Sequence, residues 1–320
     1  MKLKQFITIT LISTCLSSYA EDTSDRKVTD LILFPNQGEI FTSLNIYSLT
    51  SEYEWIYLSS NFLKSENEIT GTEISAMYSF TDQWAATISL DYVTSDKTKA
   101  TYGPATTISG TTSEYESDGL KDPNFSITYR AMDTQDDGYD LNLSIKISPK
   151  LQDAKGSTTK TDGNVAKGAT NSSVAIEWGK RNGYFSWATS LALTSNGEAE
   201  SKDVDDGDIT KVDSHGTFSI SGKFQWQLTE RLNLSTGLDI SNTGDYRVSY
   251  SDGDYFDYES ASILSLTIGT DIKLTESLYL NIDLLGAAVG DRTVTDEDNL
   301  SVTDTERKIG QFKIGLLAQF

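Results

Sequence analysis

The chain has 320 residues, of which 47 are acidic and 26 basic, and its formal net charge at pH 7 is −21. This acidic balance argues against nucleic acid and anionic membrane surfaces as partners. The single cysteine, Cys15, excludes a disulfide within the chain.

The first twenty residues predict a secretory signal peptide. Two lysines precede an apolar run from Phe6 to Leu16, and Ser18 and Ala20 have the small-residue spacing that a signal peptidase requires. Cleavage after Ala20 would remove Cys15 and both lysines, which leaves 24 basic and 47 acidic residues and a net charge of −23.

Residues 21–38 form a short polar segment with one apolar run, LILF at 31–34. The segment is too short to fold as a plug domain. Two interpretations stay open: a disordered periplasmic leader, or a short segment that enters and occludes the interior of the domain formed by residues 39–320.

Twelve segments of alternating apolar and polar residues follow, and this period of two predicts twelve β-strands. Tight turns alternate with long polar stretches that favour surface loops. Residues 52–65 either extend the first strand, form an external flap, or add a strand that would upset the even count. The predicted strands span 39–50, 69–80, 84–94, 123–132, 139–148, 172–179, 184–194, 216–228, 232–247, 260–274, 278–291 and 308–320, and the polar stretches span 95–119, 151–170, 195–214, 250–258 and 292–306.

The alternation is typical of a soluble β-sandwich as well, but three features favour a membrane barrel. Most strands reach the roughly ten residues that a crossing needs, short and long connections take turns, and aromatic residues cluster beside the short turns, as at Phe80 and Trp84. We therefore predict an all-β fold: a transmembrane antiparallel up-and-down β-barrel of about 12 strands in the cell outer membrane, with short periplasmic turns and long external loops.

The chain ends on FKIGLLAQF, with apolar residues at alternate positions up to Phe320. This ending resembles the signal that outer-membrane barrels present to their assembly machinery, which implies that machinery as a partner. The stretches YSFTDQWAATISLDY and DGLKDPNFSITYRAM resemble the outer-membrane family of the MetA pathway of phenol degradation, loosely akin to long-chain fatty-acid transporters. Ser79 stands where that family usually has glycine, and Lys121 lies inside the second motif. The resemblance implies a barrel and a hydrophobic or aromatic solute.

Ten charged residues are candidates for the lining of the lumen. Mixed signs on the inner face would either set a transverse field that selects small polar solutes, or pair across neighbouring strands and fill a narrow barrel. The candidates are Asp91, Arg130, Lys146, Glu177, Lys223, Asp239, Asp271, Lys273, Asp283 and Lys313.

No catalytic, cofactor-binding or metal site is predicted. His215 is the single histidine, and its neighbour Ser214 points to the opposite side of an extended chain, a poor geometry for a catalytic triad. Acid-rich stretches lie at 203–208, 251–257 and 295–298, and the first of them lacks the register of a calcium loop. The stretches are either solvated or bind divalent ions loosely, bridging lipopolysaccharide phosphates.

We expect a barrel without enzymatic activity that passes a small solute passively across the outer membrane. The alternative is a non-transporting structural or adhesive barrel with acidic external loops. The expected partners are outer-membrane lipid and lipopolysaccharide, the assembly machinery through Phe320, and the small-molecule solute; no nucleic acid and no cofactor is expected.

Overall fold

The computed structural model describes residues 27, 29–57, 60–104, 106, 109–156, 163–182, 184–203 and 207–320. The predicted signal peptide at 1–20 and the beginning of the segment 21–38 lie outside these residues. Among the described residues, no helix is long and apolar enough to cross a membrane.

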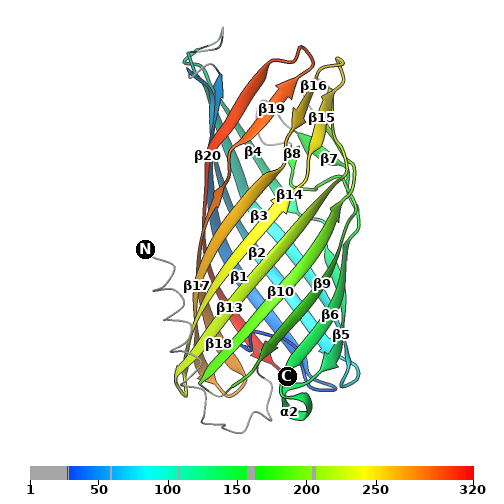
Figure 1. The fold of residues 1–320 in the computed structure, drawn as a ribbon, viewed down its shortest axis with the longest axis vertical. Helices are drawn as coiled ribbons and strands as arrows, with labels where there is room; N and C mark the ends of the chain where they lie inside the picture. Colours follow the sequence, from blue (N-terminus) through cyan, green and yellow to red (C-terminus); the bar gives the residue numbers. More distant parts are fainter. Residues whose placement is uncertain are drawn as a thin grey trace.

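Twelve long strands form a closed antiparallel barrel (Figure 1). Each strand pairs with its neighbour along the chain, and β1 pairs with β20, so the ring is closed. Closure satisfies the backbone hydrogen bonds within the ring, as a lipid environment requires. The twelve-stranded barrel is thus confirmed, with strands β1 (Ile40–Tyr57), β2 (Ser60–Ser79), β3 (Trp84–Tyr102), β5 (Asn124–Met132), β6 (Asp140–Ser148), β9 (Asn171–Lys180), β10 (Phe185–Asn196), β13 (His215–Thr229), β14 (Leu232–Thr243), β17 (Ala261–Thr275), β18 (Leu278–Val289) and β20 (Ser301–Gln319).

The two faces of the strands separate as the alternation predicts. Phe224, Leu234 and Leu238 are exposed on the outside of the barrel, whereas Lys223 and Ser235, their neighbours in sequence, line an internal cavity. A sandwich would have the opposite arrangement, with the leucines in a dry centre. The outer face therefore carries an apolar belt.

Five short turns and the carboxyl end of the chain lie at the same end of the barrel (Figure 1). The β13–β14 and β17–β18 turns have two residues each. The β5–β6 connection contains the one-turn helix α2 (Thr134–Asp137), which begins after Asp133, whose side chain accepts a hydrogen bond from the Gln135 N–H, and ends at Gly138 with φ of 81°. Only glycine adopts this left-handed conformation without strain.

The polar stretches that we expected to be surface loops contain strands over much of their length. Residues 52–57 extend β1, residues 60–65 extend β2, and the two extensions pair with each other, so the barrel wall continues beyond the apolar belt. Two of the added contacts, β4 with β8 and β7 with β11, are parallel. The added strands are β4 (Thr112–Leu120), β7 (Ala154–Gly156), β8 (Gly163–Asn164), β11 (Ala199–Asp203), β12 (Ile209–Val212), β15 (Tyr246–Tyr250), β16 (Tyr255–Tyr258) and β19 (Arg292–Asp296).

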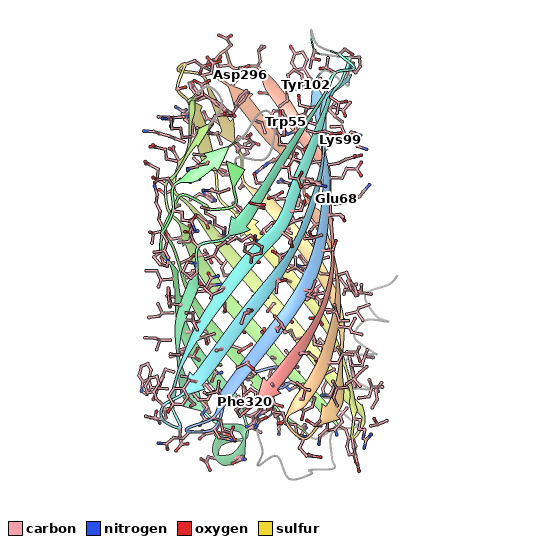
Figure 2. All side chains as sticks on the ribbon, turned by 180° about the vertical axis from the view of Figure 1, so that it is seen from behind. Trp55, Glu68, Lys99, Tyr102, Asp296 and Phe320 are labelled. Atoms are coloured by element: carbon pink, nitrogen blue, oxygen red, sulfur yellow. The ribbon has the colours of Figure 1, made fainter. Side chains whose placement is uncertain are left out.

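The outer face of this extension is polar, which explains why its strands lack an apolar period. Figure 2 shows Glu68 and Lys99 on the upper wall, well away from Phe320 at the other end. The Lys64 ammonium lies 2.8 Å from Glu52 and 3.0 Å from Glu66. Exposed ion pairs of this kind contribute little to stability. Charged side chains on the outer face show that this part of the wall faces water rather than lipid.

Candidate functional site

Residues 29–35 lie inside the barrel at the end with the short turns. Phe34 is 3% exposed, and Ile32 and Pro35 are also buried. The Gln225 side-chain amide donates a 2.8 Å hydrogen bond to the Thr29 carbonyl. None of these residues belongs to a strand. Phe34 packs into a cluster of side chains from several strands, with Leu33 and Leu317 at its edge. The strand residues of the cluster are Phe41, Met77, Ala85 and Tyr279.

A buried charge cluster contacts the same segment at Asp30. The Arg181 guanidinium lies 3.0 Å from Asp140, 3.2 Å from Asp133 and 3.6 Å from Asp30. Arg130 pairs with Asp133 at 3.0 Å, and its guanidinium lies over the Phe34 ring. Burial raises the pKa of Asp30 to about 6, against the opposing effects of a backbone hydrogen bond and of the Arg181 charge.

A cavity of about 400 Å³ lies in the lumen, with Thr29, Leu31 and Leu33 on its floor. Its walls combine polar side chains from β13, β14, β17 and β18, and four of the ten candidate residues line it together: Lys223, Asp239, Asp271 and Asp283. A solute in this cavity would meet polar groups on the walls and the apolar side chains of Leu31 and Leu33 on the floor.

Two other candidates, Lys313 and Asp91, are ion-paired, and Lys313 lies directly opposite Asp283 in the β18–β20 pair. The Lys313 ammonium lies 3.7 Å from Glu73. The Lys121 ammonium lies 2.7 Å from Asp91, which also accepts a 2.8 Å hydrogen bond from the Tyr47 hydroxyl. These ion pairs hold the side chains along the wall and neutralise part of the charge that a solute would meet there.

The remaining candidates are dispersed. Arg130 belongs to the charge cluster at the floor, and Lys273 pairs with Glu276 at the rim. Glu177 lies in β9 opposite Asn142 and Ser190 of the adjacent strands. Lys146 lines a second, smaller cavity of about 130 Å³.

Sequence reasoning missed several residues of the lumen. Tyr47 and Glu73 occupy inward positions of predicted strands, so the alternation itself was a usable signal for them. Arg181, Lys121 and Lys167 lie in connections between strands, where no period exists. Their position depends on how the connections fold back.

Aromatic side chains fill part of the lumen toward the extended end. Tyr246 and Tyr258 stack at 4.9 Å between ring centroids, and Trp55 lies 6.4 Å from Tyr258. Arg292 donates to Asp304 at 2.9 Å and to the Tyr246 hydroxyl at 3.0 Å, and both members of the ion pair are buried. This cluster narrows the barrel there.

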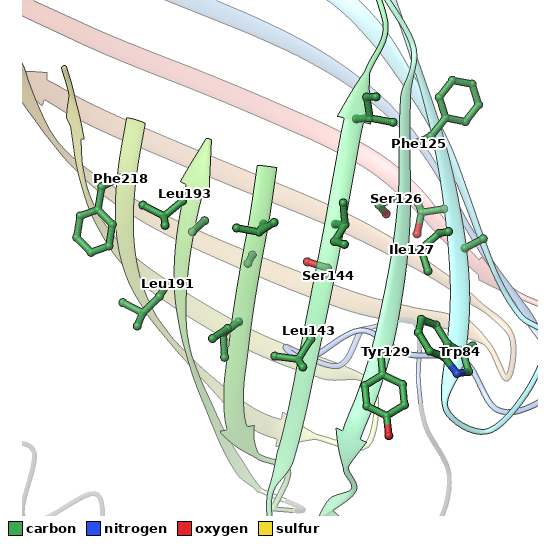
Figure 3. Close-up of a pocket in the computed structure, with 18 residues that line it drawn as sticks. Trp84, Phe125, Ser126, Ile127, Tyr129, Leu143, Ser144, Leu191, Leu193 and Phe218 are labelled. Atoms are coloured by element: carbon green, nitrogen blue, oxygen red, sulfur yellow. The ribbon is translucent and has the colours of Figure 1, made fainter. Parts of the chain in front are cut away.

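A larger hollow, of about 1050 Å³, lies on the outside of the wall (Figure 3). Trp84 and Phe125 bound it on one side and Phe218 on the other, with Leu143 and Leu191 between them. Since these side chains belong to the apolar belt, acyl chains of the membrane would cover the hollow. The lumen is the better candidate for a solute site.

His215, at the start of β13, stacks on Tyr246 with 4.7 Å between ring centroids, and its Nδ1 lies 3.1 Å from the Asp213 carbonyl oxygen. Within the described part of the chain, no group of three or more His, Cys, Asp or Glu side chains could hold a metal ion.

No protein-family model matches the sequence. A comparison with curated proteins finds no sequence relative. Among solved structures, the barrel is similar to the COG4313 outer membrane channel from Pseudomonas putida F1, with 11% identity, a TM-score of 0.57, and coverage of 91% of this chain and 98% of that one. It is also similar to the transport unit of the autotransporter AIDA-I from Escherichia coli, with 11% identity, a TM-score of 0.60 and 97% coverage of both chains.

At such low identity these similarities establish the fold alone. A closed barrel with an apolar belt and the fold of outer-membrane proteins is an outer-membrane β-barrel, so the expected location is confirmed.

Proposed function

We propose that this protein is a channel that passes a small solute passively across the outer membrane and that residues 29–35 gate its periplasmic end. The observation that carries the proposal is the polar cavity of about 400 Å³ whose floor consists of these residues. Because none of residues 29–35 is hydrogen-bonded as part of a strand, the segment can leave its place without opening the barrel wall.

The similarity to the COG4313 outer membrane channel supports a transport role, and the motifs of the MetA-pathway family extend it to hydrophobic or aromatic solutes. The apolar side chains of Leu31 and Leu33 on the cavity floor suit an apolar portion of such a solute. The polar walls suit a solute that also carries a polar group, since buried polar groups need partners.

A second candidate function, a structural or adhesive barrel, is favoured by one observation. The aromatic cluster around Tyr246 and Tyr258, with the buried Arg292–Asp304 pair, occupies the lumen toward the extended end. If that cluster leaves no path, the barrel would not conduct.

Planar-bilayer recording decides between the two. The wild-type protein should show small conductance steps, and replacement of residues 29–35 by a glycine-serine sequence of equal length should give larger and longer openings. Gln37→Ala, an exposed change just beyond the segment, should behave as wild type. Silence of both the wild type and the replacement variant, with no solute-dependent swelling of proteoliposomes, would support the structural role instead.

A further inference from the structure

A small cavity of about 130 Å³ in the lumen collects two lysines and no carboxylate. Lys146 faces inward from β6, because its neighbours Ile145 and Ile147 are exposed on the outer face. Lys167 reaches the same cavity from the connection between β8 and β9. We call this site the lysine pocket; its other polar lining residues include Asn124, Asn171, Asn196, Ser148, Ser173 and Thr194.

The two ammonium groups lack ion-pair partners. In the part of the chain that the structure describes, no carboxylate oxygen lies within 4.0 Å of either group. Asp122 attracts Lys167, but its two oxygens accept backbone hydrogen bonds from Leu151 at 3.0 Å and from Lys167 itself at 3.2 Å. Lys121, the third lysine of this region, is paired with Asp91. The lysine pocket therefore holds two ammonium groups without a direct ion-pair partner, and Asp122 compensates the charge of Lys167 in part.

Lys146 and Lys167 are both exposed to water in the lumen, and their like charges repel each other there. Burial lowers the pKa of Lys167, and the charges of Lys121 and Lys146 lower it further. The protein as a whole has 47 acidic and 26 basic residues. A cavity lined by two lysines and no carboxylate therefore differs in charge from the rest of the chain. An anion between Lys146 and Lys167 would relieve the repulsion.

Lys167 is held by a structured segment rather than a loose loop. The Asn164 side-chain oxygen accepts hydrogen bonds from the backbone N–H groups of Lys155 and Ala166, at 3.1 and 3.2 Å. Gly168 has φ of +68°, and a Cβ there would meet the Glu200 carbonyl oxygen at 2.5 Å. The backbone on both sides of Lys167 is thus fixed, so the Cα of Lys167 is held beside the cavity that its side chain lines.

The donors around the cavity define the chemistry of the ligand. Each ammonium has three N–H donors and no acceptor, and the carboxamides and hydroxyls can donate as well. A volume of 130 Å³ corresponds to about four waters at roughly 30 Å³ each, which is enough for a carboxylate or phosphate group. In the larger cavity the single lysine, Lys223, is outnumbered by Asp239, Asp271 and Asp283, which together would repel such a group.

We infer that the lysine pocket binds the anionic group, carboxylate or phosphate, of a small solute inside the barrel. Binding by itself does not require conduction. Only the further conclusion, that the solute taken across the membrane is a small organic anion, rests on the proposed channel function.

The test is anion binding by the purified, detergent-solubilised barrel, measured by titration calorimetry with sodium benzoate and with inorganic phosphate at constant ionic strength. Lys146→Gln and Lys167→Gln should each weaken binding at least about tenfold, because each removes a charge-assisted hydrogen bond. Lys99→Gln, a lysine on the outer wall, is the matched control and should bind as wild type.

Benzoate binding would identify carboxylates as the ligand class, and phosphate binding without benzoate binding would identify phosphates. Unchanged affinity in the double variant, or no binding of either anion tighter than about 10 mM to the wild type, would overturn the inference. In bilayers under a salt gradient, the double variant should lose anion preference relative to wild type. If anion binding depends on the lysines but the protein never conducts, the proposal of an anion site in the lysine pocket would stand and the proposed channel function would be refuted.

Discussion

Truncation of Phe34 tests whether burial of one side chain holds the segment 29–35 inside the barrel. Phe34 is 3% exposed and is surrounded by side chains on rigid strands, among them Phe41 and Tyr279, which cannot collapse into the space that the ring leaves. Removal of a buried phenylalanine ring costs about 3–5 kcal/mol. Because the segment is not part of the sheet, this cost should fall on docking of the segment rather than on unfolding of the barrel.

At about 1.4 kcal/mol per factor of ten, Phe34→Ala should increase the undocked population by roughly a hundredfold or more. The single cysteine lies in the predicted signal peptide, so a cysteine introduced by Ile32→Cys, a buried position, can report undocking through its rate of reaction with a thiol reagent. The rate should rise by about that factor in Phe34→Ala and stay constant in Gln37→Ala. Equal rates in the two variants would refute the idea that burial of Phe34 holds the segment.

Three further predictions concern charge, packing and assembly. Because burial raises the pKa of Asp30 to about 6, docking of the segment 29–35 should be strongest near pH 4 and weaken by about 3 kcal/mol as the pH rises through 6. The rate of thiol labelling at Ile32→Cys, normalised to the intrinsic reactivity of a free thiol at each pH, should rise with pH accordingly. A rise of the same size in the Asp30→Asn variant would contradict this assignment. Gly71→Ala should lower the urea midpoint of unfolding, because a Cβ at this position would lie 2.8 Å from the Tyr92 carbonyl oxygen. Gly222→Ala should leave the midpoint unchanged, because a Cβ there would have nothing within 4 Å, and equal midpoints for the two variants would contradict the packing argument. Phe320→Ser should reduce the amount of barrel assembled in cells. Refolding of the purified variant in detergent should stay normal, because Phe320 is 73% exposed and contributes little packing. Loss of refolding would instead indicate a structural role for the ring.

The position of a strand and the direction of its side chains could be predicted where one face meets lipid. The predicted segment 278–291 corresponds to β18, Leu278–Val289, and the predicted 84–94 begins where β3 begins, at Trp84. In these segments the requirement for alternate apolar residues is local, and it can be read from a few consecutive positions.

Beyond the apolar belt this signal disappears although the strands continue. Residues 95–102 belong to β3 and pair with β2 and β4, yet they contain lysines and threonines on the face that meets water. Their strand structure depends on cross-strand hydrogen bonds to residues distant in sequence. We could not predict these strands, because no apolar period is needed where the outer face meets water instead of lipid.

The sequence by itself determined the twelve long strands and, within the apolar belt, the alternation of their two faces, because a strand that meets lipid on one side needs an apolar residue at every second position. Only the tertiary structure decided which inward groups meet. Residues 29–35 reach a cluster formed with β1, β2, β3 and β18, and a connection that folds back brings Lys167 to the cavity that Lys146 also lines. Such contacts depend on closure of the barrel and on the path of its connections, and neither leaves a periodic trace in the chain.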